Sequence, residues 1–317
     1  MLAWRETAPG SPRANGLTMA DAIRRAAVAG SWYPGSAAAL AAAVDTYLTA
    51  VGQEPPPLRD VVALVAPHAG LMYSGPVAAH AYQLLRARPP ELAVLVGPSH
   101  FVDFEGVAIS EAVGFETPLG VAEIDLDCQA ALRAASPLVH VRPSAHAREH
   151  SIEMQLPYLR RLAPQAKIVP LVMGRQTADT ARVLGDALGA VLGVDGIHGI
   201  HGGRRALLVA STDLSHYHDA ATAERLDAVV SDHVSRFDEN GLQAALDARP
   251  DHACGGGPTV AVMRAARQLG ARDAVVLHYG HSGDVSGDRS AVVGYLAAAL
   301  GTREPAGPVA PVAPGGP

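Results

Sequence analysis

The chain has few cysteines, few aromatic residues and hardly any lysine. Its only cysteines, Cys128 and Cys254, are far apart in the sequence and form no disulfide framework, so we expect a reducing, cytoplasmic compartment. Lys167 is the one lysine, and arginine carries the remaining positive charge, which we interpret as compositional bias. The formal net charge of −6 excludes the basic excess that binding to nucleic acid or to an anionic membrane favours.

Long hydrophobic runs are also missing. No apolar run reaches the ~18 residues that a membrane-spanning helix needs. The first residues contain Arg5, Glu6, Pro9 and Pro12 where a secretory signal has an uninterrupted apolar core. We therefore expect no membrane association. With 317 residues, 49% of them hydrophobic and 18% charged, the chain is long enough to bury a substantial globular core.

Composition divides the chain into three parts. The predicted parts are a flexible leader at 1–20, one α/β domain at 21–301 and a disordered Pro/Ala/Gly tail at 302–317. Either Met1 or Met19 is the expected start of the protein. The glycine-rich stretch 193–204 repeats Ile-His-Gly and is predicted to be a surface loop.

Three short apolar runs each end near a histidine. The runs are too short for helices and are typical of strands buried on both faces, and they lie at 61–65, 92–96 and 206–210. They lead into His68, His100 and His216, respectively. A single histidine in a loop is usually a solvated or hydrogen-bonded bystander. Because neighbouring parallel strands direct their terminal loops to one place, the threefold repetition favours a shared site.

Apolar periodicity and turn residues predict the other elements. We expect strands at 107–110, 121–124, 167–173 and 274–277, and helices at 36–50, 125–135, 178–192, 222–237, 242–248 and 259–269. Pro76 is predicted to be the first residue of a helix that runs to Tyr82. A polar loop is expected at 279–288, followed by a closing strand and short helix at 291–300.

The stretch 143–157 contains the pattern HxxEH. On a helix that ends at Pro157, His146, His150 and Glu153 would share one face. One interpretation is an inverted zincin motif and hence a zinc hydrolase on His146 and His150. The others are a solvated helix face, or a helix that presents His150 and Glu153 to the strand-end site. We favour the last, because so short a pattern arises easily by chance in a histidine-rich chain.

The two cysteines differ in context. Cys128 falls within a predicted helix and is expected to be a small buried apolar residue. Cys254 precedes a glycine turn and a predicted helix, where backbone N–H groups and the helix dipole are expected to lower its pKa. Near the start of the domain, Trp32 is expected either to pack against the edge of the core or to line the mouth of a pocket.

Taken together, these strings resemble a known family. The strings, in order, are VAGSWYP, APHAG with YSG, GPSH, TPLG, EHSIEMQLPYL, STDLSHY, the Cys-Gly turn, and SGD ahead of VVGY. They resemble the Memo family, named in bacteria as AmmeMemoRadiSam system protein B, over residues 27–299. That family is similar to the class III extradiol ring-cleaving dioxygenases. The resemblance implies a single-domain α/β layered sandwich with a central mostly parallel or mixed sheet flanked by helices.

The resemblance also implies a non-haem metal site and its residues. The implied metal ligands are His68, His100 and Cys254, the implied catalytic groups are His216 and Asp213, and the implied supporting groups behind the ligands are His150 and Glu153. Cys254 stands where a dioxygenase has a carboxylate. Iron is the expected metal ion, with copper or zinc as alternatives, because a thiolate makes the site softer.

Two classes of function remain open alongside the zinc hydrolase. The leading hypothesis is a dioxygenase-like oxidoreductase that acts on a small molecule. The alternative is a non-catalytic module that binds a peptide or another ligand in the same cleft. The bacterial family name also implies a functional association with a radical-SAM protein. Nucleotide binding has no support, since no glycine-rich pattern follows a strand in the dinucleotide or Walker format.

Overall fold

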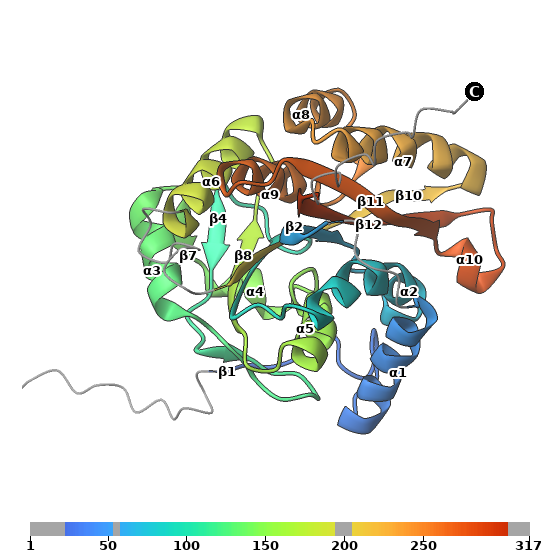
Figure 1. The fold of residues 1–317 in the computed structure, drawn as a ribbon, viewed down its shortest axis with the longest axis horizontal. Helices are drawn as coiled ribbons and strands as arrows, with labels where there is room; N and C mark the ends of the chain where they lie inside the picture. Colours follow the sequence, from blue (N-terminus) through green and yellow to red (C-terminus); the bar gives the residue numbers. More distant parts are fainter. Residues whose placement is uncertain (1–22, 53–57, 194–204, 304–317) are drawn as a thin grey trace, which may run out of the picture.

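A computed structural model describes residues 23–52, 58–193 and 205–303 (Figure 1). The predicted leader before residue 21, the tail after residue 303 and nearly all of the Ile-His-Gly loop lie outside the described residues. Among the helices that the model describes, none combines the length and apolar character that crossing a membrane requires.

The described part of the chain is organised around a nine-stranded mixed sheet with the order β10-β12-β2-β9-β3-β8-β4-β7, and β11 also pairs with β12. Strands β2, β9, β3 and β8 run parallel, whereas β12 is antiparallel to its neighbours. The strands are β2 (Asp60–Ala66), β3 (Leu92–Pro98), β4 (Val107–Ile109), β7 (Val139–Val141), β8 (Lys167–Met173), β9 (Ala206–Ser211), β10 (Asp213–His218), β11 (Asp273–His281) and β12 (Val292–Thr302).

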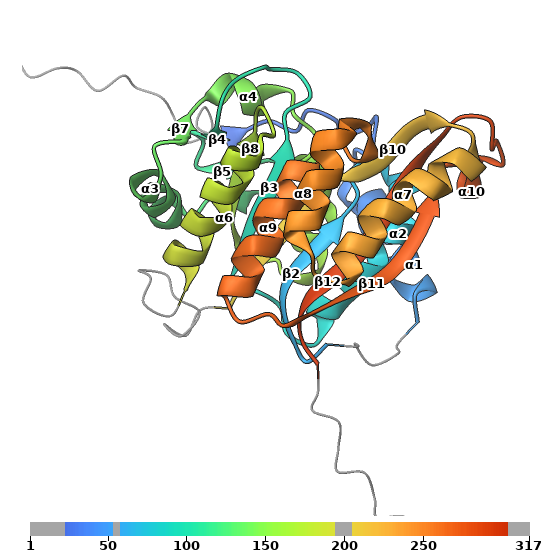
Figure 2. The same ribbon diagram turned by 90° about the horizontal axis from the view of Figure 1, so that it is seen from above.

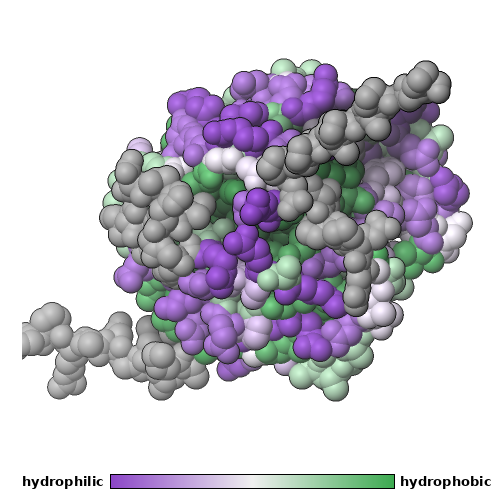
Figure 3. Space-filling view, viewed as in Figure 1, coloured by the Kyte–Doolittle hydropathy of each residue, from purple (hydrophilic) through white to green (hydrophobic). Residues whose placement is uncertain are grey.

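Helices cover both faces of this sheet, as Figures 1 and 2 show. One face packs against α3 (Leu126–Ala135), α6 (Ala178–Leu192), α7 (Ala220–Ser235), α8 (Glu239–Ala248) and α9 (Gly256–Gln268). The other face packs against α1 (Ala37–Ala50), α2 (Leu71–Tyr82) and α5 (Leu156–Leu162). The three layers confirm the predicted α/β sandwich. Hydrophilic side chains dominate the outer surface at the top of Figure 3, over α7 and α8.

Shorter elements complete the described chain. A small sheet joins β1 (Ile23–Arg24), β5 (Gly114–Phe115) and β6 (Ala122–Glu123). The remaining helical turns are η1 (Gln83–Arg86), α4 (Pro143–Ala147), η2 (Glu153–Gln155), η4 (Pro250–His252) and α10 (Gly283–Ser286). Ser36 caps α1 by accepting a hydrogen bond from the backbone of Ala39. Such a bond satisfies one of the N–H groups that a helix leaves free at its start.

The predicted meeting point of three strand ends is confirmed. Strands β2, β9 and β3 are parallel neighbours, and Ala66 at the end of β2 pairs with Ser211 at the end of β9. On the other side of β9, Ala210 pairs with Val96 of β3. The loops that follow these strands therefore leave the sheet at one edge. His68 and His100 lie in two of those loops.

Several predicted elements are wrong in their bounds or type. Helix α2 begins at Leu71 after Gly70, and Pro76 lies inside it, so the helix gives up one backbone hydrogen bond there. The segment Asp213–His218 is strand β10 and not part of a loop, because it pairs with β12. The predicted closing strand and short helix form the single strand β12, and β11 extends to His281 into the predicted polar loop.

The single helix predicted around His146 is also wrong. Helix α4 ends at Ala147, and Pro157 lies in the first turn of α5, where its missing N–H costs no helical hydrogen bond. His150 lies in the turn between these helices and Glu153 starts η2. His146, His150 and Glu153 therefore do not share a helix face.

The central strand provides a test of the core. Leu95 of β3 is fully buried, whereas Leu126 at the start of α3 is 48% exposed. We predict that Leu95→Ala lowers the free energy of unfolding by about 2–5 kcal/mol, because it removes buried methyl groups and leaves a cavity. The matched substitution Leu126→Ala is expected to change it by less than about 0.5 kcal/mol. Urea denaturation measures both, and equal effects would contradict this assignment of the core.

Candidate metal centre

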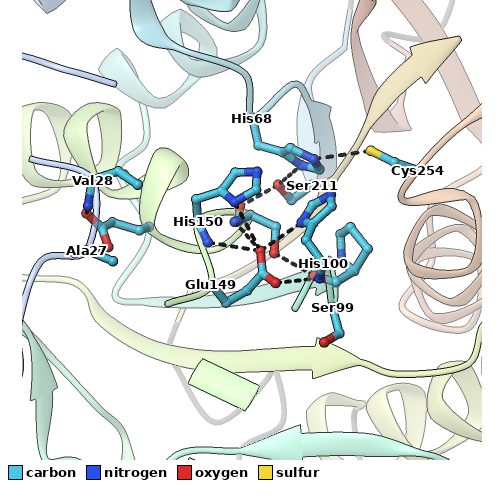
Figure 4. A network of polar contacts seen from close by, with 12 residues as sticks. Ala27, Val28, His68, Ser99, His100, Glu149, His150, Ser211 and Cys254 are labelled. Atoms are coloured by element: carbon cyan, nitrogen blue, oxygen red, sulfur yellow. Dashed lines mark hydrogen bonds and ion pairs between the residues drawn. The ribbon is translucent and has the colours of Figure 1, made fainter. Parts of the chain in front are cut away.

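Three side chains from distant parts of the chain meet at the edge of the sheet. One ligand atom each from His68, His100 and Cys254 lies within 4.8 Å of the others (Figure 4). The His68 Nε2 atom is 3.2 Å from Cys254 Sγ, and the rings of His68 and His100 are 5.2 Å apart between centroids. We call these three residues the His/His/Cys cluster. The structure thus brings together the three residues predicted to be metal ligands.

Hydrogen bonds fix which nitrogen of His68 carries the proton. The Ser211 hydroxyl lies 2.9 Å from His68 Nδ1 and donates its own proton to the Ser151 carbonyl at 2.6 Å. Because a carbonyl only accepts, the hydroxyl must accept from His68, and Nδ1 carries the proton. The Nε2 lone pair is then free and faces Cys254. Burial lowers the pKa of His68 well below its usual value, and the nearby His100 charge lowers it further.

His100 is oriented by a carboxylate. Its Nδ1 atom is 2.9 Å from Glu149 Oε1, and its backbone N–H donates to Glu149 Oε2 at 2.6 Å. Burial raises the pKa of the Glu149 carboxyl, but the hydrogen bond and charge of His100 and the surrounding N–H groups outweigh it, so the net pKa is low. An ionised carboxylate only accepts, so His100 also carries its proton on Nδ1 and presents Nε2.

Glu149 was not among the predicted site residues, although it lies within one of the motifs quoted above. Besides His100, its Oε1 atom accepts the backbone N–H groups of His150 and Ser151, each at 2.9 Å. The carboxylate is 2% exposed, so these donors replace the water that it loses on burial. The only signal in the sequence was that Glu149 precedes His150. A solvent-exposed glutamate can occupy such a position equally well, and only the folded turn shows that this one is buried.

His150 lies against the cluster, as predicted. Its ring stacks on that of His100 with centroids 4.4 Å apart and an interplanar angle of 21°. The Trp32 ring also lies against it, with centroids 4.3 Å apart. Burial lowers the pKa of His150, and the charges of His68 and His100 add to the effect. With His100 and Glu149 it forms a second group of side chains close enough to hold a cation.

Cys254 is held by the neighbouring strand. The backbone N–H of Asp213 points to Cys254 Sγ at 3.3 Å, and the Cys254 N–H donates to the Asp213 carbonyl at 3.2 Å. Burial raises the pKa of the thiol, and the Asp213 carboxylate raises it further. The prediction that this thiol titrates low is therefore wrong, because desolvation outweighs the helix end and the N–H groups.

Asp213 and His216 both lie on β10 beside the cluster. The Asp213 carboxylate accepts the backbone N–H groups of His68 at 2.7 Å and Ala69 at 3.3 Å, so it fastens the His68 loop to β10. Burial raises its pKa, and these donors offset part of the effect. His216 Nδ1 donates to the Leu214 carbonyl at 2.8 Å, which leaves its Nε2 free. The charge of His216 lowers the pKa values of both His68 and Asp213.

Glu153 binds a different part of the molecule from the one expected. Its Oε1 atom accepts from the Val28 N–H at 3.0 Å and the Tyr33 hydroxyl at 2.6 Å. Its Oε2 atom accepts from the Ala27 N–H at 2.8 Å and pairs with the Arg24 guanidinium. Residues 27–34, which we call the strap, are thus anchored by this carboxylate. Through the strap, which carries Trp32 to His150, Glu153 is linked to the side chains beside the cluster.

His146 lies apart from the cluster. Its Nε2 atom donates to the Ala108 carbonyl at 3.1 Å, and its ring packs 5.9 Å from that of Phe115. Burial lowers its pKa to about 4. In the described part of the chain it belongs to neither group of side chains that could hold a metal ion. The geometry therefore does not support a zinc hydrolase on His146 and His150.

Gln155 and Ser211 are further residues that the sequence analysis missed. The Gln155 side-chain amide donates to the Ser211 hydroxyl at 2.7 Å and to the Pro67 carbonyl at 3.1 Å, while its oxygen accepts from Tyr82. These bonds lock the hydroxyl that sets the His68 tautomer. In the sequence, each of these is a polar residue next to an apolar stretch. That signal is weak, because the sequence does not show which polar group such a residue contacts.

Comparison with known proteins identifies the family. A family model described as Memo-like protein matches residues 24–299. The chain belongs to the Memo-like protein family. A MEMO1 family protein of Methanothermobacter thermautotrophicus is 37% identical over 283 residues, covering 86% of this chain and 98% of that protein. MEMO1 family proteins of Methanosarcina mazei and Nitrosopumilus maritimus are 39% and 31% identical, over 75% and 86% of this chain and 85% and 98% of their own length.

The Memo-like match spans every residue of the site. The cluster, its supporting residues Glu149 and Ser211, and the strap after residue 24 all lie within the matched range. The resemblance seen in the short motifs is thereby confirmed.

The tautomers provide a test of this Memo-like site. We predict that long-range ¹H–¹⁵N spectra show His68 and His100 protonated on Nδ1. Ser211→Ala removes the acceptor for His68 and is expected to let its Nε2–H form appear, while His100 stays unchanged and acts as the internal control. A wild-type protein with Nε2–H on either histidine would contradict the proposed hydrogen-bond directions.

Proposed function

We propose that this protein binds one metal ion through His68, His100 and Cys254 and acts as a dioxygenase-like oxidoreductase on a dihydroxy-aromatic substrate. The observation that supports the proposal is the convergence of two imidazoles and one thiol within 4.8 Å, at the edge of the sheet where three strands end. In open α/β sheets this edge, outside the carboxyl ends of the strands, is where ligands bind.

The donor set fits a metal ion. Both imidazoles have Nδ1 engaged, by Ser211 and by Glu149, so Nε2 is the free nitrogen on each ring. A carboxylate behind a ligating histidine is a usual support for a bound metal. Two histidines and one anion are a minimal set that leaves positions open for other ligands. Metal coordination deprotonates a thiol outright, which offsets the effect of burial on Cys254.

Iron is the metal ion that we propose, with copper and zinc as alternatives. Two imidazoles with a carboxylate are typical of non-haem iron oxygenases, whereas a thiolate makes the set softer and closer to the preferences of copper and zinc. The bound ion would supply Lewis acidity and a site for dioxygen. Ring cleavage places both oxygen atoms of O₂ in the product, so the reaction needs no external reductant.

The protein groups around the cluster have distinct tasks in this proposal. His216 Nε2, left free by the bond from Nδ1 to Leu214, accepts the proton from a substrate hydroxyl. Asp213 keeps the His68 loop on β10 through its bonds to two backbone N–H groups. Trp32, whose ring lies 4.3 Å from that of His150, would limit the access of water to the cluster when a ligand is bound.

A binding module is the second candidate, and one observation favours it. Trp32 and Phe101 are 38% and 48% exposed, and both contact His150, with ring centroids at 4.3 and 5.9 Å. The Arg148 guanidinium lies 4.8 Å from the centre of the Phe101 ring. Exposed aromatic and arginine side chains are typical of surfaces that bind peptides. In this reading, ligand affinity would survive the loss of Cys254.

Elemental analysis tests the metal site. We predict about one metal ion per chain in protein purified from cytoplasm, and less than about a tenth of that in Cys254→Ser and His68→Gln. His278→Gln, which changes an exposed histidine on β11, is the control and is expected to keep its metal. Glu149→Gln is expected to weaken metal affinity by about 10–100-fold. Full metal content in Cys254→Ser, or loss only in His146→Gln, would contradict the proposed ligands.

Oxygen uptake tests the reaction. After anaerobic loading with Fe(II), we predict that the protein consumes O₂ when a catechol is added. His216→Gln is expected to lower kcat by about 10²–10⁴-fold because it removes the proton acceptor, while its metal content stays that of the wild type. Full metal occupancy without any O₂ uptake would reject the oxidoreductase and favour the binding module. Calorimetry can then measure the affinity of the protein for peptides with and without a chelator.

A further inference from the structure

A cavity adjoins the strap. It has a volume of about 530 Å³ and lies between the strap, α1 and the start of α2. Its walls include Trp32 and Tyr33 of the strap, Tyr47 of α1, and Met72 and Tyr73 of α2. This volume falls in the range of pockets that hold small organic molecules. We call it the strap pocket.

The strap pocket and the His/His/Cys cluster share a wall. Trp32 lines the pocket, and its ring also lies 4.3 Å from that of His150, which stacks on His100. The carbonyl of Trp32 accepts the N–H of Leu71 at 2.8 Å, so the strap is tied to the chain that follows His68. Trp32 therefore belongs to the strap pocket and also contacts a side chain that packs against the cluster.

The chemistry of the lining points to an uncharged ligand. The lining residues, all of which lie in the described part of the chain, are glycine, serine, proline, alanine, leucine, methionine, tryptophan and tyrosine, none of them charged. A charged ligand group would lose its hydration here without gaining an ionic partner. Met72 is 57% exposed and Trp32 38% exposed, so two large apolar side chains remain available at the surface of the protein.

Two tyrosines in the lining differ from the buried tyrosines. The hydroxyls of Tyr33, Tyr82 and Tyr158 are bonded to Glu153, Gln155 and the carbonyl of Gly75. Within residues 23–52, 58–193 and 205–303, the hydroxyls of Tyr47 and Tyr73 make no hydrogen bond with the protein. A partly buried tyrosine usually satisfies its hydroxyl. Each of these two hydroxyls is therefore available to solvent or to a neutral polar group of a ligand.

We propose that the strap pocket binds an uncharged alkyl or aryl substituent of the aromatic substrate, whose hydroxyl groups lie at the His/His/Cys cluster. The proposal rests on the proposed function for the reacting end of the substrate. It defines the substrate class as dihydroxybenzenes with an apolar substituent, and it disfavours substrates with a carboxylate on that substituent.

Binding of 4-alkylcatechols of increasing chain length tests the pocket. Calorimetry on the Fe(II)-loaded protein under anaerobic conditions measures Kd without turnover, because no O₂ is present. The affinity is expected to rise about fourfold for each methylene, the factor that corresponds to ~0.8 kcal/mol per buried CH₂. In a Trp4→Phe background, which leaves Trp32 as the only tryptophan, the longer ligands are expected to quench the fluorescence. A 4-(carboxyalkyl)catechol of equal length is expected to bind more weakly than its alkyl counterpart.

Two variants and one matched control assign the binding to the pocket. Ala43→Trp fills the cavity from α1, whereas Ala42→Trp places the same side chain on the exposed side of that helix. The gain with chain length is expected to disappear in Ala43→Trp and to persist in Ala42→Trp. Met72→Glu is the second variant, because this exposed residue tolerates a charge without unfolding the protein. It is expected to weaken binding of the longest alkylcatechol by at least about tenfold.

The outcomes separate this proposal from the proposed function. No gain with chain length in the wild type, or an equal gain in Ala43→Trp and Met72→Glu, would overturn the strap pocket. If affinity increases with chain length in the wild type and both variants abolish this increase, the pocket is supported even without O₂ uptake. In that case only the proposed oxidoreductase reaction is rejected. O₂ uptake at the same kcat/KM for catechol and all alkylcatechols supports the reaction and overturns the pocket.

Discussion

The parallel pairing of β2, β9 and β3 is the constraint on which the His/His/Cys cluster depends. The pairing of Ala66 with Ser211 fixes the level at which β2 and β9 end, and this places the Ser211 hydroxyl 2.9 Å from His68 Nδ1. A shift of one residue would turn Ser211 to the other face of the sheet, because strand side chains alternate. The register of the sheet therefore sets both the position and the tautomer of a candidate ligand.

Two carboxylates in one short segment connect this edge of the sheet to the rest of the molecule. Glu149 accepts four N–H groups from around His100 and His150, and Glu153 accepts from the strap. Both are almost fully buried, at 2% and 0% exposure. A buried carboxylate is stable only when hydrogen-bond donors replace the water that it loses. Glu149 and Glu153 therefore each hold their donor groups in fixed positions. The segment between them thereby couples the strap to the cluster.

Much of the fold was predictable because local pattern and burial agree. Strand β8 and helix α6 have the predicted bounds, since apolar runs and a clear cap define them. The end of α2 was predictable but its start was not. Proline is common at the first position of a helix, so the sequence suggested that the helix begins at Pro76, which in fact lies inside it. The convergence of His68 and His100 followed from strand order. The roles of Glu149 and Glu153 could not follow, because only the tertiary turn decides which carboxylate faces which donor.

The pKa of Cys254 shows why local context alone is insufficient for this site. In sequence, a helix start and glycine N–H groups favour a thiolate. In the fold, desolvation and the Asp213 carboxylate act in the opposite direction and prevail. A metal ion bound at the proposed site would reverse that balance, since it would attract the thiolate and both nearby carboxylates, Asp213 and Glu149. The lining of the strap pocket carries no charged residue. Under the proposal, selectivity for the remote end of a ligand would therefore depend on apolar contacts.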